Sequence, residues 1–418
     1  MGMKKLIMVP GNVSSPFFLN ELEIALKYYD KVSIIDFGGK KEIGKKITEQ
    51  YGIKYIQCAP SVGSISFWQK FARWLHQEHV KEEIKDNFEI SYKGIKKIAY
   101  ILFYGMYCVQ GESIIDAEIA VDCQEDIDLY AYWLSRPAYL VAQYKQKNDR
   151  INSIISRAHR YDLYFDRNSV HYLPFRKFID SSIDVIYFIS ENGRKYYESE
   201  YPKKGVQLKC IRKVARLGTY NGEYQKTGEL NRRIVLVSCS NIISVKRLDL
   251  IVDVLEKLKH YEIMWYHFGT GKLEKEIERY CKEKLTKDSY KLCGYVDNKE
   301  ILKKYKEYNA NFFINMSDSE GIPVSIMEAM SFGIPVIARN VGGMSEIVNE
   351  ENGLLLENDD AEDAASKISS LLTDCREKTG KYETMCKKAY DTWNERYNAE
   401  KNYNIFYSQM MKGEKRGD

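Results

Sequence analysis

The chain has 418 residues, a length that suits two α/β domains better than one hydrophobic core. Its 63 basic and 59 acidic side chains leave a net charge of only +4, which argues against a general nucleic-acid-binding protein. The nine cysteines are odd in number and lack C-x-x-C spacing, so we expect reduced thiols and neither a disulfide framework nor a zinc site. The amino terminus runs into a strand without a signal-peptide layout, and no apolar run reaches ~20 residues. We therefore expect a cytoplasmic chain that neither spans a membrane nor is exported.

The first domain is predicted over residues 1–217. Short apolar runs alternate with helical patterns, which is typical of a doubly wound parallel sheet. The expected strands are residues 5–9, 31–37, 127–132, 151–156 and 185–190, with helices at 17–29 and 139–147. The loop at residues 10–16 has a single glycine, so it is not a dinucleotide-binding fingerprint.

An amphipathic helix over residues 66–80 combines aromatic side chains with basic flanks: Phe67, Trp68, Phe71, Trp74, Lys70 and Arg73. This composition is typical of a helix on a membrane surface. The alternative, which the pattern alone favours, is a helix packed on its own sheet. Residues 93–109 follow as a basic and then apolar stretch of about twelve apolar residues, too short to cross a bilayer, and would help the first helix lie on one.

The second domain is predicted over residues 232–396, after a polar, glycine-punctuated linker at 218–231. Strands are expected at residues 234–238, 263–268 and 311–315, and helices at 248–259 and 361–372. Residues 397–418 form a terminal segment whose amphipathic helix is expected to return to the first domain.

The densest pattern lies at residues 311–338, which predict a strand, a polar loop, a short helix and another strand. Glu320 precedes the helix and Glu328 follows eight positions later, about two turns along at ~3.6 residues per turn, so the two carboxylates should have different partners. The free N–H groups that open the helix, together with its dipole, predict an anion site. The plain alternative is a helix-start acid and a surface acid.

The order Glu320-Gly-Ile-Pro-Val-Ser-Ile-Met-Glu328, followed by Gly342-Gly343 and Glu346, resembles the E-x7-E signature of retaining, nucleotide-sugar-dependent glycosyltransferases of family four. The resemblance implies that Glu320 contacts hydroxyl groups of the donor sugar and that Glu328 binds the ribose. It also implies that the donor diphosphate lies against the start of the helix, at Gly321, Ile322, Pro323 and Val324.

Three further segments resemble the same family. After the strand at 234–238, the family has an Arg and then, five residues on, a Lys that clamp the diphosphate; Lys246 matches the Lys, but Asn241 stands where the Arg is expected. Either Arg247 substitutes for that arginine or the helix terminus supplies more of the charge. The family also places a turn beneath the nucleotide base and a histidine near the donor sugar and acceptor, roles that fall here on Tyr295, Val296 and His159.

The resemblance implies a GT-B fold, with two Rossmann-like domains facing a cleft, the donor on the second and a saccharide acceptor, lipid-linked in our expectation, on the first. Lys246, Glu320 and His159 are the expected catalytic residues. We expect retention at the anomeric carbon without a cofactor or metal, because no D-x-D pair is suitably placed, and a location in the cytoplasm or on the inner face of the membrane. The alternatives are a GT-B sugar-nucleotide epimerase or phosphorylase and a non-catalytic nucleotide-sugar-binding protein.

Overall fold

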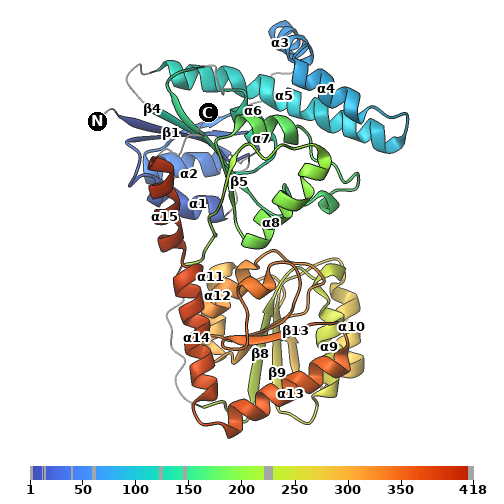
Figure 1. Cartoon of the computed structure of the whole chain (residues 1–418). Helices are drawn as coiled ribbons and strands as arrows, with labels where there is room; N and C mark the ends of the chain where they lie inside the picture. Colours follow the sequence, from blue (N-terminus) through green and yellow to red (C-terminus); the bar gives the residue numbers. More distant parts are fainter. Residues whose placement is uncertain are drawn as a thin grey trace. The chain divides into compact units, whose positions relative to one another are not determined.

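The structure is a computed structural model that describes residues 3–11, 13, 16–38, 41–58, 63–121, 126–144, 148–220 and 229–412. The chain divides into two compact units (Figure 1). Unit 1 comprises Met1–Arg216 together with Tyr403–Asp418, and unit 2 comprises Leu217–Asn402. Each unit is a parallel sheet with helices packed on its faces.

Unit 1 is built on a seven-stranded parallel sheet in the order β3-β2-β1-β4-β5-β6-β7. The strands are β1 Lys4–Val9, β2 Lys31–Asp36, β3 Lys54–Gln57, β4 Asp126–Ala131, β5 Ile151–Ala158, β6 Val185–Phe188 and β7 Ile211–Val214. The central strands β1 and β4 are buried along almost their whole length, as a parallel sheet covered on both faces requires. The strand order reverses between β1 and β4, which makes this the point where loops diverge at the carboxyl edge.

The helices of unit 1 begin with α1 Pro16–Ala25, α2 Lys41–Tyr51, α3 Ile65–Leu75, α4 Glu78–Asn87, α5 Tyr92–Ala120, α6 Arg136–Ala142, α7 Arg176–Ser182 and α8 Glu191–Glu200. The final helix, α15 Ala399–Met411, enters unit 1 at Tyr403. Its Phe406 ring lies 4.1 Å from the guanidinium of Arg157, which is fully buried and pairs with Glu21 at 2.8 Å. The carboxyl-terminal part of α15 thus belongs to unit 1.

The prediction that the aromatic side chains of residues 66–80 face a membrane is wrong for three of the four. Phe67, Phe71 and Trp74 are 3%, 9% and 3% exposed and belong to the core of unit 1. The Trp74 indole packs so closely on α5 that a Cβ at Gly105 would lie 2.4 Å from it, and its N–H donates to the Tyr139 hydroxyl at 2.8 Å. The alternative expected a helix packed on its own sheet; the helix is instead packed within unit 1 mainly on α5, with Trp68 left half exposed.

The stretch at residues 93–109 forms part of α5, a helix of 29 residues. Among the described residues, α5 is the single helix long and apolar enough to cross a bilayer by length and composition. One of its faces carries Ile101, Tyr104 and Tyr107 into the core. Packing against α3 and α6 thus accounts for much of its apolar composition.

Unit 2 is a six-stranded parallel sheet in the order β10-β9-β8-β11-β12-β13, reversing between β8 and β11. Its strands are β8 Ile234–Cys239, β9 Ile263–Phe268, β10 Tyr290–Leu292, β11 Phe312–Asn315, β12 Val336–Arg339 and β13 Gly353–Leu356. Its helices are α9 Leu248–Lys257, α10 Glu274–Lys284, α11 Asn298–Glu307, α12 Val324–Ser331, α13 Ala361–Glu377 and α14 Lys381–Arg396. The predicted strands and helices of this half are confirmed, and most of the predicted linker at 218–231 lies outside the described residues.

Candidate active site

The site residues of unit 2 lie on loops at the carboxyl edge of its sheet. The loop after β8 carries Asn241, Lys246 and Arg247, and the loop after β11 carries Glu320. Because the strand order reverses between β8 and β11, these two loops border the position at which open α/β sheets bind ligands. A backbone hydrogen bond from Asp318 to the carbonyl of Val245, 2.9 Å long, joins them directly.

Lys246 and Glu320 are in contact. The Lys246 ammonium donates to Glu320 Oε1 at 2.5 Å, with the two side chains 21% and 5% exposed. The partly buried Lys246 ammonium can bind an incoming anion. Its contact with Glu320 holds that carboxylate at a defined position. The structure therefore brings together the residues expected to bind the diphosphate and the sugar.

Arg247 is held by other carboxylates. Its guanidinium pairs with Asp249 at 3.0 Å, with Asp318 at 3.1 Å and with Asp359 at 3.3 Å, and Asp318 also accepts from Arg339. These ion pairs tie the Glu320 loop to the start of α9. They favour a positioning role for Arg247 over direct replacement of the missing arginine, whose position is occupied by the exposed Asn241.

The amino terminus of α12 is open for an anion. Its N-cap is Pro323, which has no side chain able to accept from the first helical N–H groups, so these groups keep their donor capacity. The glycine loop after β12 lies against the preceding backbone: a Cβ at Gly342 would stand 1.9 Å from the Glu320 carbonyl oxygen. Gly342 has φ +59°, so a side chain would be strained there as well as blocked. Close packing of backbone on backbone thus holds the Gly321–Val324 segment in position, and the Ile322 side chain lies in the core.

Glu328 lies on the body of α12, as predicted, and its carboxylate accepts a hydrogen bond from the Asn298 side chain at 2.7 Å. Burial raises the pKa of Glu328 to about 7, and the Asn298 hydrogen bond opposes this shift. Asn298 opens α11, directly after the turn with Tyr295 and Val296, so the predicted base turn and the predicted ribose acid are neighbours. Tyr295 is 81% exposed, and a large aromatic ring in that state is available for stacking.

His159 lies in unit 1 at the end of β5, close to the switch point of that sheet. Its imidazole is 6% exposed, with the Tyr132 and Trp133 rings 4.8 and 4.2 Å from it. Its Nδ1 stands 3.9 Å from Asp162, too far for a hydrogen bond, and neither ring nitrogen has a hydrogen-bond partner among the described residues. Burial lowers the pKa of His159, and Asp162 opposes the effect. A neutral imidazole with unused hydrogen-bonding capacity therefore sits at the carboxyl edge of unit 1.

Asp162 fixes this segment. Its carboxylate accepts from the backbone N–H of His159 at 2.7 Å and from that of Leu134 at 2.6 Å, which joins the loop after β4 to the loop after β5. Arg176 donates to the carbonyl oxygens of both Leu134 and Asp162. The sequence analysis assigns no role to Asp162, because that role depends on a contact that periodicity does not report.

Asn298, Asp318 and Arg339 are site residues that the sequence analysis missed. Asp318 lies on the loop after β11 and Arg339 is the last residue of β12, and they meet only because these two strands are paired. Asn298 sits at a helix start, where asparagine is common for local reasons, so its pairing with Glu328 gave no separate signal.

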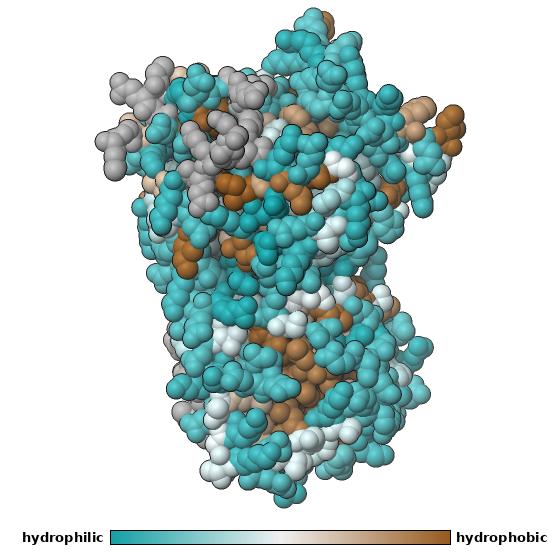
Figure 2. All heavy atoms as spheres, viewed as in Figure 1, coloured by the Kyte–Doolittle hydropathy of each residue, from teal (hydrophilic) through white to brown (hydrophobic). Residues whose placement is uncertain are grey.

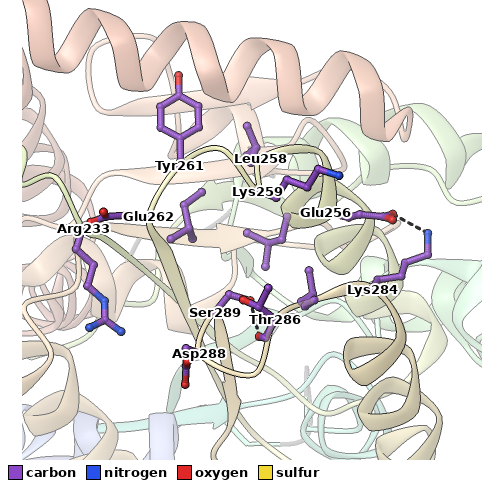
Figure 3. A pocket seen from close by; sticks show the side chains of 13 residues that line it. Arg233, Glu256, Leu258, Lys259, Tyr261, Glu262, Lys284, Thr286, Asp288 and Ser289 are labelled. Atoms are coloured by element: carbon purple, nitrogen blue, oxygen red, sulfur yellow. Dashed lines mark hydrogen bonds and ion pairs between the residues drawn. The ribbon is translucent and has the colours of Figure 1, made fainter.

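A pocket of about 420 Å³ lies elsewhere in unit 2 (Figure 3). Its lining comes from the amino ends of strands and the carboxyl ends of helices, including Arg233, Ile263 and Leu285, and one wall carries the Glu256–Lys284 ion pair. This is the edge opposite the Lys246 and Glu320 loops. Parallel α/β sheets bind ligands at the carboxyl edge, so we do not assign this pocket to the chemistry.

Known proteins are similar to part of the sequence and to the fold. Residues 222–391 match the model of the family "Glycosyl transferases group 1". The chain is 28% identical over 182 residues to sulfoquinovosyl transferase SQD2 of Arabidopsis thaliana, covering 40% of this chain and 33% of that protein. It is 27% identical over 199 residues to the O-antigen biosynthesis glycosyltransferase WbnH of Escherichia coli, covering 47% and 53%. The chain thus spans between a third and about half of these two relatives.

Solved structures are similar over the whole chain. HepE of Anabaena in complex with UDP superposes with a TM-score of 0.68 at 16% identity, covering 98% of this chain and all of the other. The lipopolysaccharide outer core galactosyltransferase WaaB gives 0.67 at 14% identity, covering 98% and 99%. At these identities the likeness establishes the fold. Residues 222–391 are thus similar to the glycosyl transferases group 1 family, and the two parallel sheets have the GT-B architecture.

Proposed function

We propose that this protein is a retaining glycosyltransferase that moves a sugar from a nucleoside-diphosphate sugar to a saccharide acceptor. The observation that carries the proposal is the Lys246–Glu320 pair beside the uncapped start of α12. It combines a positive charge, helix N–H donors and a carboxylate at one edge of one sheet. A diphosphate needs the first two, and sugar hydroxyl groups need the third.

In the proposed reaction the bond between the anomeric carbon and the diphosphate oxygen breaks, and the acceptor oxygen bonds to that carbon on the same face. The acceptor proton passes to the departing phosphate, so no protein carboxylate acts as a nucleophile. Lys246 and the α12 N–H groups stabilise the charge that develops on the diphosphate, and Glu320 holds the sugar in the reactive orientation. Binding of the diphosphate requires Lys246 to loosen its contact with Glu320, which frees the carboxylate for the sugar.

The donor is oriented along unit 2 in this proposal. Glu328 and Asn298 bind the ribose. The base lies over Tyr295 and Val296, on the side of the ribose away from Lys246. HepE, a protein of the same fold, has been solved in complex with UDP, which makes a uridine nucleotide the first donor class to test.

The acceptor is proposed to be a growing saccharide, lipid-linked as in cell-surface polysaccharide synthesis. Its support is the O-antigen biosynthesis glycosyltransferase among the relatives. His159 is proposed to contact the donor sugar or acceptor, because its two ring nitrogens lack partners among the described residues. The proposed location is the cytoplasm or the cytoplasmic membrane face.

Metal-independent turnover is part of the proposal. Lys246 and the α12 dipole supply positive charge at the diphosphate, which is the task a divalent cation performs in other transferases. We expect activity to persist in EDTA. Loss of activity in EDTA that magnesium or manganese restores would contradict this expectation.

The deciding experiment has two readouts. A panel of nucleotide-sugars is scored first by the rise in melting temperature, because a ligand that binds only the folded state stabilises it by mass action. Acceptor-dependent release of the nucleotide is then measured for the best donor, with Lys246→Ala and, as a matched control, the distant surface variant Lys282→Ala. We expect release by the parent and the control and a loss of at least about a hundredfold in Lys246→Ala.

The alternatives predict other outcomes. An epimerase would convert the donor without any acceptor, and a phosphorylase would require inorganic phosphate. A non-catalytic binding protein would show the melting shift without nucleotide release.

A further inference from the structure

The turn between α4 and α5 carries an exposed apolar cluster that the proposed chemistry does not use. Phe88 is 69%, Ile90 95%, Tyr92 72% and Ile95 69% exposed. We call these four side chains the tip. Figure 2 shows hydrophobic residues protruding at the upper right of the view, where Figure 1 places the far ends of α4 and α5. Isolated exposed apolar side chains are ordinary, whereas four within eight positions on one protrusion mark an interaction surface.

The turn that carries the tip is held in place by hydrogen bonds and close packing. The Ser91 hydroxyl caps α5 by accepting from the Gly94 N–H at 3.0 Å, and the Ser91 N–H donates to the Glu89 carbonyl at 2.9 Å. A Cβ at Gly94 would lie 2.1 Å from that carbonyl oxygen, so glycine allows the turn to close. Ile90 and Ile95 occupy the positions where a capped helix often buries two apolar side chains against each other, yet both remain exposed.

Three lysines at the start of α5 have the wrong sign for the stability of this helix. Lys93, Lys96 and Lys97 occupy its first two turns, and its first turn has no acidic residue. The positive end of the helix dipole disfavours lysine at this place, typically by ~0.3–1 kcal/mol for each charge near the terminus. Lys96 also lies 4.6 Å from the Tyr92 ring, so basic and aromatic groups share one surface. Local helix physics does not explain these lysines, but an anionic partner does.

The apolar surface continues along α5. Phe103, 55% exposed, is eleven residues after Tyr92 and therefore on the same helix face. Ile95 also lies on that face, and the opposite face is buried in the core of unit 1. A rigid helix with one face in the core and the other apolar with basic residues at its start is suited to lie along an interface between water and hydrocarbon.

We propose that the tip and the adjoining face of α5 dock unit 1 onto an anionic lipid bilayer, with Phe88, Ile90 and Ile95 in the acyl boundary and Lys93 and Lys96 at the headgroups. Apolar side chains and lysines act together in such a contact, and neither set alone gives stable attachment. The surface that meets the membrane in this proposal is the exposed tip. The aromatic face of α3 is buried in the core of unit 1. The inference rests on this surface and does not require the proposed transferase reaction.

The test is flotation of the full chain with vesicles of phosphatidylcholine alone and of phosphatidylcholine mixed with phosphatidylglycerol. We expect binding to the mixed vesicles, weakened by high salt, and little binding to the neutral ones. Phe88→Ser with Ile90→Ser, and separately Lys93→Gln with Lys96→Gln, should each lower the bound fraction, with a partition coefficient reduced by at least about tenfold. Because the altered side chains are exposed, their melting temperatures should stay at the parent value.

Ile405→Ser is the matched control, since it removes an aliphatic side chain that is 56% exposed in the same unit. Its vesicle binding should equal that of the parent. Full binding by the Phe88→Ser, Ile90→Ser variant, or no binding by the parent, overturns the proposal. Self-association of the parent that this variant abolishes, without vesicle binding, would assign the tip to a second copy of the chain instead. The assay contains no donor or acceptor, so its failure is distinguishable from a failure of the proposed reaction.

Discussion

Glu328 carries a charge that changes within the physiological pH range, because burial raises its pKa to about 7. Ribose hydroxyl groups donate hydrogen bonds and need the carboxylate, so donor binding should weaken as the pH falls through this value. We expect an affinity loss approaching about tenfold for each pH unit below 7. Calorimetric titration across this range checks it, and Glu328→Gln should bind weakly with a flat profile. An equal pH dependence in the parent and Glu328→Gln would contradict the assignment.

The same pKa sets a stability trend in the ligand-free protein. The folded carboxyl holds its proton up to about 7, whereas the unfolded one loses it near 4.5. Between these values the folded state binds more protons, so this residue's contribution to the free energy of unfolding decreases as the pH rises. Donor binding, which needs the ionised form, should therefore be accompanied by proton release near neutral pH.

Glu320 and Glu328 should differ in their kinetic effect. We expect Glu328→Ala to weaken donor binding and Glu320→Gln mainly to lower kcat, because ribose contacts are uniform whereas sugar contacts tighten as the glycosidic bond breaks. Glu320→Gln also removes the negative charge that pairs with Lys246 and leaves the ammonium more available to the diphosphate, so the KM for the donor should not rise. Steady-state kinetics of both variants is the measurement, and parent-like kinetics in both would remove them from the site.

His159 should matter to turnover more than to folding. We predict a kcat loss of about ten- to a thousandfold in His159→Ala. Because the imidazole is buried between Tyr132 and Trp133, alanine also leaves a cavity, and His159→Phe is the cleaner variant: it keeps a ring and removes both nitrogens. A folded His159→Phe protein with normal turnover would make His159 a packing residue.

At the scale of the element, the loop after β12 positions the start of α12. We predict that Gly342→Ala weakens donor binding and lowers the melting temperature, because the new Cβ would meet the Glu320 carbonyl oxygen at 1.9 Å. The matched control is Gly380→Ala, which has a similar φ of +75° but nothing within 4 Å. The control should lose only the ~1–2 kcal/mol of left-handed backbone strain and keep its donor affinity. Equal donor affinities in the two variants would exclude a positioning role for this loop.

At the scale of the whole molecule, the last helix is part of the core of unit 1. Tyr403, Phe406, Tyr407 and Met410 are at most 2% exposed. Removing Phe406 exposes the buried Arg157–Glu21 pair, so Phe406→Ala should cost about 3–5 kcal/mol in the free energy of unfolding. Denaturant unfolding followed by limited proteolysis checks it. Ile405→Ala, altering an exposed neighbour, should be nearly neutral, and a similar loss in both would show that α15 is only weakly attached.

The sequence by itself determined the α/β class, most central strands and the Glu320–Glu328 segment. Those features are local: apolar runs, helix-start and helix-end residues, and a fixed spacing along one helix. The edge strands β3 and β7 and the helix α4 were missed because their apolar patterns are short.

Tertiary structure decided the rest. The aromatic face of residues 66–80 has the same periodicity whether it meets lipid or α5, and only the packing of Trp74 on Gly105 shows which. Likewise, no spacing reports that Lys246 meets Glu320, that Arg247 is held by three carboxylates, or that Asn298 bonds Glu328. Apart from Arg247 and Asp249, which are two positions apart, these pairs join residues 30 to 112 positions apart, and the strand order of the sheet brings them together.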